Sequence, residues 1–234
     1  MNGRWTVGKP APSAARGLVG WTVLAVLFLS NIPTVQLSAQ QFSIGPQIVF
    51  GDYRETSAQL SYRGGGLGAK GSVVWKKFSA DVWLSKIRYK PSGGTATNEF
   101  DASEIDVLVR YYVAGAFSAE LGYLNRKAEP EFEAQSMGAM TAGAQMAHSL
   151  GPGVRMRLNG GVMLGSKFSG GGLVSELGAV RLGLGLTVDA LRGRLRLTGD
   201  YDFQSVSRQT DNGGGALSAP IQQSLGRIGL AIAF

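Results

Sequence analysis

The chain has 234 residues and a formal net charge of +7, with 44% hydrophobic residues and 17% charged residues. The charged share lies below the roughly 25% that is usual for a soluble domain. Cysteine is absent and His148 is the single histidine, which excludes disulfides, iron–sulfur clusters and multi-histidine metal sites. We therefore expect no metal and no cofactor.

Residues 1–39 have the pattern of a secretory signal peptide. Arg4, Lys9 and Arg16 precede an apolar run over 18–29, which is too short to span a bilayer as a helix. We expect cleavage after Ala39, although Leu37 departs from the usual small residue; an uncleaved anchor is the alternative. No basic patch interleaved with aromatic residues follows, so we expect no nucleic-acid partner. Residues 40–234 then form the mature domain.

The mature domain alternates apolar and polar residues with the period of two that is typical of strands. The pattern is clearest in four segments, 105–113, 154–164, 180–188 and 195–203. Six weaker segments, which bring the count to ten, cover 41–50, 66–76, 78–89, 116–126, 135–148 and 221–234. In 78–89, Val82 and Leu84 share one face while Trp83 and Ile87 share the other, so we expect a bulge or a misassigned face there.

Short and long connections alternate along the chain. The short ones are 76–77, 114–115, 151–153 and 190–193, and the long ones are 51–64, 90–102, 127–134, 166–175 and 207–220. Strict alternation places all short turns at one rim of the sheet and all long loops at the other.

These features predict an all-β fold, a closed antiparallel up-and-down transmembrane β-barrel of ten strands, with eight or twelve strands left open. A closed barrel pairs every backbone group, as lipid requires. The alternative is a soluble β-sandwich or lipocalin-like barrel whose apolar faces point inward. The polar faces are rich in arginine and glycine rather than in lysine and glutamate, which favours the membrane barrel.

The C-terminal segment SLGRIGLAIAF places apolar residues at every second position and ends in an aromatic residue: Ile228, Leu230, Ile232 and Phe234. This resembles the C-terminal assembly signal of small bacterial outer-membrane β-barrel proteins. The resemblance implies a location in the bacterial outer membrane, contact with outer-membrane lipid, and recognition by the outer-membrane barrel assembly machinery. It indicates no subfamily, and the oligomeric state stays open.

The polar faces are expected to line the lumen with a hydrated network of ion pairs, because buried charges cost several kcal/mol each unless they are paired. Its members are Lys70, Asp106, Arg110, Glu120, Arg155, Arg157, Arg181, Arg194, Arg196, Asp200, Asp202 and Arg227. Such a network favours a largely plugged barrel with a structural or surface-interaction role. The excess of arginines leaves a narrow anion-preferring pore as the alternative.

A lipid- or peptide-modifying enzyme is the second alternative, with His148 as its sole candidate base. His148 lies at a strand end near a short turn, and Asp189, Asp200 and Asp202 are expected to bind arginines, so we expect no catalytic residues and no enzyme activity. The aromatic residues are expected to form belts at the membrane interfaces. Those considered are Trp75, Phe78, Tyr89, Tyr111, Tyr112, Phe117, Tyr123, Tyr201 and Phe203.

Overall fold

The computed structural model describes residues 41–129, 132–170, 173–211 and 216–234. The predicted signal peptide lies outside the described residues. The strands are β1 (Gln41–Glu55), β2 (Leu60–Trp75), β3 (Phe78–Gly94), β4 (Phe100–Ala114), β5 (Phe117–Glu129), β6 (Met137–Gly151), β7 (Val154–Phe168), β8 (Leu173–Ala190), β9 (Leu195–Asp211), β10 (Ala216–Ser218) and β11 (Ile221–Ala233). Two 3₁₀ turns, η1 (Glu133–Gln135) and η2 (Leu191–Gly193), lie between strands.

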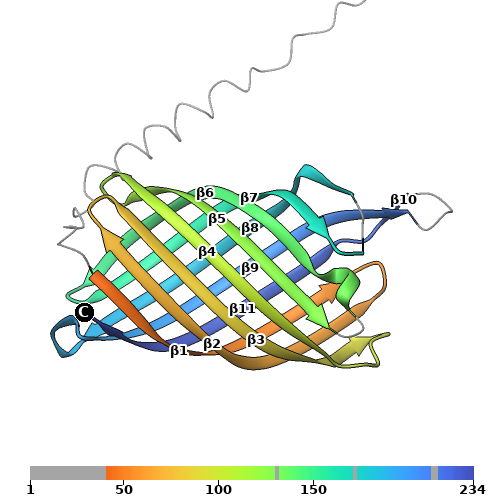
Figure 1. Cartoon of the computed structure of the whole chain (residues 1–234), viewed down its shortest axis with the longest axis horizontal. Coiled ribbons are helices and arrows are strands. Elements are labelled where there is room, and N and C mark those ends of the chain that lie inside the picture. Colours follow the sequence, from red (N-terminus) through yellow and green to blue (C-terminus); the bar gives the residue numbers. More distant parts are fainter. Residues whose placement is uncertain (1–40, 130–131, 171–172, 212–215) are drawn as a thin grey trace, which may run out of the picture. The chain divides into compact units, whose positions relative to one another are not determined.

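The strands form one closed antiparallel barrel (Figure 1). Each strand pairs with its neighbour in the chain, β9 pairs with β11, and β11 pairs with β1 from Ser43 to Glu55, which closes the wall. The three-residue β10 pairs with the end of β9 and extends that hairpin. The described wall therefore has ten strands, and the predicted fold and strand count are confirmed.

The strands are longer than the sequence pattern indicated, so the predicted boundaries of the first two long loops are wrong. Glu55 pairs with Leu60, which leaves 56–59 rather than 51–64 as the first connection, and the second is 95–99 rather than 90–102. The glycines at 64–66 belong to β2. A Cβ on Gly64 would lie 2.7 Å from Cγ2 of Ile87, so glycine at that position lets an inward side chain of β3 pack against the wall.

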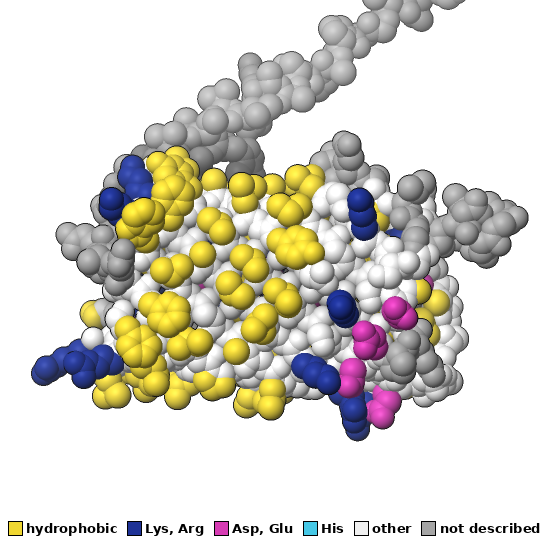
Figure 2. Space-filling view, viewed as in Figure 1, with side chains coloured by type: hydrophobic (Ala, Val, Ile, Leu, Met, Phe, Trp, Pro, Cys, Tyr) yellow, Lys and Arg dark blue, Asp and Glu magenta, His cyan; other side chains and the backbone are white. Residues whose placement is uncertain are grey.

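Over most of the barrel the apolar residues point outward. Leu182 is 56% exposed on the outer surface, whereas Asp106 and Arg227 are 0% and 1% exposed inside. Figure 2 shows hydrophobic side chains spread over the wall, basic ones near both ends, and acidic ones gathered toward the end at which β10 lies. The alternative of a soluble barrel with inward apolar faces is therefore wrong for this part of the structure, because here the inner face of the barrel is charged.

At the long-loop end most of the interior is apolar, apart from the pair formed by Glu55 and Arg208. Tyr53, Tyr62, Tyr89 and Phe100 are buried there, and Phe132 packs on them. This explains the ambiguous pattern of 78–89, where β3 pairs with β4 without interruption and the expected bulge is absent. The pairing of β3 with β2 has its register shift between Ser61 and Tyr62 of β2, opposite residues of β3 that follow 78–89.

Candidate functional site: the charged lumen

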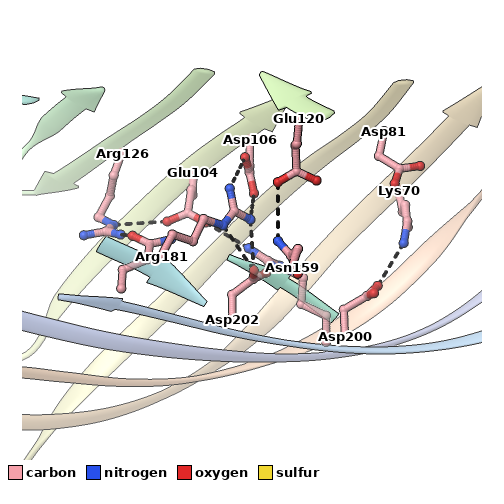
Figure 3. A network of polar contacts seen from close by, with 12 residues as sticks. Lys70, Asp81, Glu104, Asp106, Glu120, Arg126, Asn159, Arg181, Asp200 and Asp202 are labelled. Carbon is pink, nitrogen blue, oxygen red and sulfur yellow. Dashed lines mark hydrogen bonds and ion pairs between the residues drawn. The ribbon is translucent and has the colours of Figure 1, made fainter. Parts of the chain in front are cut away.

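Charged side chains meet across the middle of the lumen in what we name the central cluster (Figure 3). It has three basic and three acidic members: Glu104, Asp106, Arg126, Arg181, Asp202 and Arg227. Arg181 of β8 donates two hydrogen bonds to Asp106 of β4, at 2.9 and 2.5 Å. Arg227 of β11 binds Glu104 of β4 at 2.9 Å. These bonds join strands on different sides of the wall, so they cross the lumen.

A second group, the turn-side cluster, lies nearer the short turns. It also has three basic and three acidic members: Lys70, Asp81, Arg110, Glu120, Arg157 and Asp200. Arg110 binds Asp81 at 2.6 Å and Glu120 at 2.7 Å, and Asp200 accepts from Lys70 at 2.9 Å and from Arg157 at 2.6 Å. Each cluster is thus neutral by itself.

Trp83 lies between the two clusters. The Nζ atom of Lys70 is 4.7 Å from the ring centroid of Trp83, and the guanidinium carbon of Arg227 is 5.9 Å from it. Such cation–π contacts stabilise a cation that is removed from water. The free space beside Trp83 is about 20 Å³, enough for about one water molecule. Little room for hydrated ions remains at this level.

The long-loop mouth is covered by the segment that includes η1. Gln135 donates to Glu55 at 3.0 Å and accepts from Arg208. Phe132 stacks on Phe100 with ring centroids 4.3 Å apart. The mouth is therefore closed by hydrogen bonds through Gln135 on one side and by stacked aromatic rings, the aromatic cap, on the other.

At the short-turn end the lumen opens into a cavity of about 60 Å³. Asp189 binds Arg196 at 2.7 Å and lies 3.9 Å from Arg155, whose side chain is half exposed. This is the one described level of the lumen at which basic side chains outnumber acidic ones.

Nine of the twelve lumen residues singled out from the sequence belong to the two clusters: Lys70, Asp106, Arg110, Glu120, Arg157, Arg181, Asp200, Asp202 and Arg227. Arg155 and Arg196 lie at the short-turn mouth. Arg194 is exposed in the turn after β8, outside both clusters.

Five buried charged residues inside the barrel are not among these twelve: Glu55, Asp81, Glu104, Arg126 and Arg208. Asp81 shares a strand face with Trp83 and Ile87, so the sequence pattern indicated an apolar face there. Glu55 and Arg208 fell within segments expected to be loops. The centre has no excess of positive charge, because Arg155, Arg194 and Arg196 lie outside the two clusters. In addition, Asp81 and Glu104 contribute two carboxylates there against the one guanidinium of Arg126.

Most of the aromatic residues assigned to the interfacial belts do point outward; Trp75, Phe78, Tyr111, Tyr123 and Tyr201 are exposed. Tyr89 was assigned wrongly, because it is 1% exposed in the interior and stacks on Phe100. Tyr112 is half-buried and lines the cavity at the short-turn end.

The residues of the expected assembly signal lie at the seam of the barrel. Ile228, Leu230 and Ile232 are exposed on the outer face of β11, which pairs with β1, and Phe234 stacks on Phe42. Recognition of this strand by an assembly machinery stays a prediction.

The features considered for catalysis lie apart from one another. His148 is half-buried on the outward side of β6 and is the cross-strand partner of Met156. Asp189, Asp200 and Asp202 all bind basic side chains. The described residues contain no group of three or more acidic or histidine side chains placed to hold a metal ion. They also contain no helix that is long and apolar enough to cross a membrane.

No protein-family model and no curated protein matches the chain. Similar solved structures include the translocator domain of autotransporter NalP from Neisseria meningitidis, at 14% identity over 94% of this chain and 96% of that one, with a TM-score of 0.43. The outer membrane protease OmpT from Escherichia coli is 9% identical over 88% of this chain and all of that one (100%), with a TM-score of 0.42. The outer membrane protein OprG from Pseudomonas aeruginosa is 12% identical over 84% and 96%, with a TM-score of 0.37. All three TM-scores lie below 0.5, so the function proposed below rests on the chain's own surface and lumen.

Proposed function

We propose that the protein is an integral barrel of the bacterial outer membrane that does not conduct ions and has a structural or surface-interaction role. The observation that supports it best is the pair of neutral clusters across the lumen, with about 20 Å³ of free space beside Trp83. An ion that passed this level would have to displace guanidinium groups from buried carboxylates, and breaking one such pair costs about 3–5 kcal/mol.

The membrane location is supported by the outer surface. Leu182, Leu184 and Ile228 are exposed on a closed wall, where water would favour polar residues and lipid favours apolar ones. The expected signal peptide and C-terminal strand support export and assembly in the outer membrane. Lipid and the assembly machinery are then the partners that we propose.

A narrow anion-preferring pore is the second candidate. It is favoured by the short-turn mouth, where Arg155 and Arg196 face Asp189 alone. The two neutral clusters beyond this mouth favour the plugged lumen instead.

Conductance in planar bilayers tests the proposal. We expect a flat trace from the refolded protein and small discrete steps from the double variant Arg181→Ser/Asp106→Ser, which removes a neutral pair from the constriction. The matched control is Arg88→Ser/Asp101→Ser, an exposed pair on the outer wall, which should stay silent. Anion-selective steps from the unaltered protein would overturn the proposal and establish the pore.

A further inference from the structure

Two lysines flank a serine in a single row across the outer face of β3, β4 and β5. Lys86 is the cross-strand partner of Ser103, and Ser103 is the partner of Lys127. Neighbouring strands lie 4.7–4.9 Å apart, so the two lysine backbones are about 10 Å apart with the serine hydroxyl between them. Both flexible side chains can therefore bring their ammonium groups to one anion above Ser103.

This row, the Lys86–Ser103–Lys127 row, borders the apolar surface directly. The next row toward the short turns contains Leu84 and Ile105, both exposed, and Leu67 lies beside Lys86 on β2. A shallow, almost flat surface hollow extends over these apolar residues and includes Lys86 and Ser103. The apolar surface therefore adjoins the lysines of this row directly.

A second hollow of about 420 Å³ begins at the same row and extends toward the long loops. It is lined by Lys86, Arg88, Glu99, Phe100, Asp101, Ser103, Lys127 and Glu129. The two hollows share Lys86 and Ser103, so together they offer an apolar floor and a polar upper part. That division matches a lipid, which has apolar chains and a polar headgroup.

Of the three acidic residues that line the upper hollow, Asp101 alone lies within ion-pair distance of a lysine of the row. Asp101 pairs with Arg88 at 2.9 Å and with Lys86 at 3.8 Å, so the two basic side chains share its carboxylate. The side chain of Lys86 is 72% exposed. No described residue lies within ion-pair distance of Lys127. An external anion would thus meet Lys127, the hydroxyl donor Ser103, and Lys86, for which it would compete with Asp101, while Glu99 and Glu129 line the same hollow.

We propose that the Lys86–Ser103–Lys127 row binds the phosphate of a membrane lipid whose acyl chains lie on Leu67, Leu84 and Ile105. This inference rests on the membrane insertion proposed above. Lysine binds phosphate as a point charge and does not require a rigid geometry. Each lysine near an anionic membrane surface contributes about 1 kcal/mol, which is about fivefold in affinity.

Binding of phosphatidic acid to the full-length refolded protein in detergent, followed by native mass spectrometry, tests the proposal. The probe carries an exposed phosphate, and phosphatidylcholine with the same acyl chains is the control lipid. We expect Lys86→Gln/Lys127→Gln to weaken binding of phosphatidic acid about 25-fold. The matched variant Lys76→Gln/Lys77→Gln removes two lysines from a short turn and should bind like the unaltered protein.

Three results would overturn the proposal: equal binding by Lys86→Gln/Lys127→Gln, an equal loss in Lys76→Gln/Lys77→Gln, or equal binding of phosphatidylcholine. Millimolar inorganic phosphate is a further arm, because full competition by it would indicate a site for soluble phosphate rather than for a lipid. Folding is checked by the shift of unheated protein in SDS gels. Lipid binding and conductance are separate readouts, so a protein that conducts and still binds the lipid would refute only the proposed function.

Discussion

Replacing Arg181 by leucine should reveal how strongly the central cluster depends on pairing. Arg181 donates to Asp106 at 2.9 and 2.5 Å and to Asp202 at 3.2 and 3.0 Å. Asp202 also binds Arg227. Among the described residues, Asp106 has Arg181 as its one ion-pair partner. Arg181→Leu therefore leaves a fully buried carboxylate without a cation.

The expected loss in free energy of unfolding is about 3–5 kcal/mol for Arg181→Leu. Asp106→Leu is expected to cost less, about 1–3 kcal/mol, because Arg181 keeps Asp202 as a partner. In Arg181→Leu/Asp106→Leu the unpaired carboxylate is absent, so the loss should fall below that of Arg181→Leu alone. The corresponding coupling free energy is about 2–3 kcal/mol.

Urea unfolding of the barrel in lipid vesicles, followed by tryptophan fluorescence, measures these values. Arg88→Leu is the control, because it removes an exposed arginine that also pairs with an aspartate. Its unfolding midpoint should stay unchanged. If the losses of the two single variants add to that of the double variant within about 0.5 kcal/mol, the reasoning about pairing is refuted.

Two further substitutions test the outer surface and the mouth. Leu182→Arg should destabilise the barrel by about 2–4 kcal/mol in vesicles if Leu182 faces the middle of the lipid. Leu182→Met, the control, should cost less than about 1.5 kcal/mol. Equal stability of the two variants in urea titrations would contradict the contact of Leu182 with lipid. Phe132→Ala removes the stacking on Phe100 and should lower the free energy of unfolding by about 1–3 kcal/mol. It should leave the bilayer trace flat, because the clusters lie deeper in the lumen; steps in that trace would show that the aromatic cap blocks the barrel.

The strand segments that have an apolar outer face and a polar inner face throughout could be predicted from the sequence. In β8, outward Leu182 and Leu184 alternate with inward Arg181 and Gly185, and the structure has the predicted faces. The pairing partners could not be predicted, because they depend on contacts between distant strands. Arg181 meets Asp106, which lies 75 positions earlier in the chain. Periodicity indicates whether a residue points inward or outward. It carries no information about which residues of two distant strands lie at the same level along the barrel.

The extent of the strands could not be predicted either, because the wall continues beyond the apolar surface. Glu55 and Arg208 lie near the long-loop end of the wall, in segments whose polar or glycine-rich sequence resembles a loop. Their neighbours Tyr53 and Val206 are buried, which is the pattern of a soluble protein. A sequence pattern that is typical of a membrane strand therefore ends before the strand does.

This change of pattern occurs at the same level on both faces of the wall. Along β3 the outward residues pass from Leu84 to Lys86, while the inward ones pass from Trp83, which contacts the charged clusters, to apolar Ile87. The same exchange occurs in β4, where outward Ile105 is followed toward the long-loop end by Ser103.

The medium outside the wall explains both changes. Lipid favours an apolar outer face and leaves the inner face to paired charges, whereas water favours the reverse. Under the proposed membrane insertion, the point at which both faces change corresponds to the boundary of the lipid. The polarity of the interior takes no part in lipid binding, and it supports a headgroup depth for the Lys86–Ser103–Lys127 row.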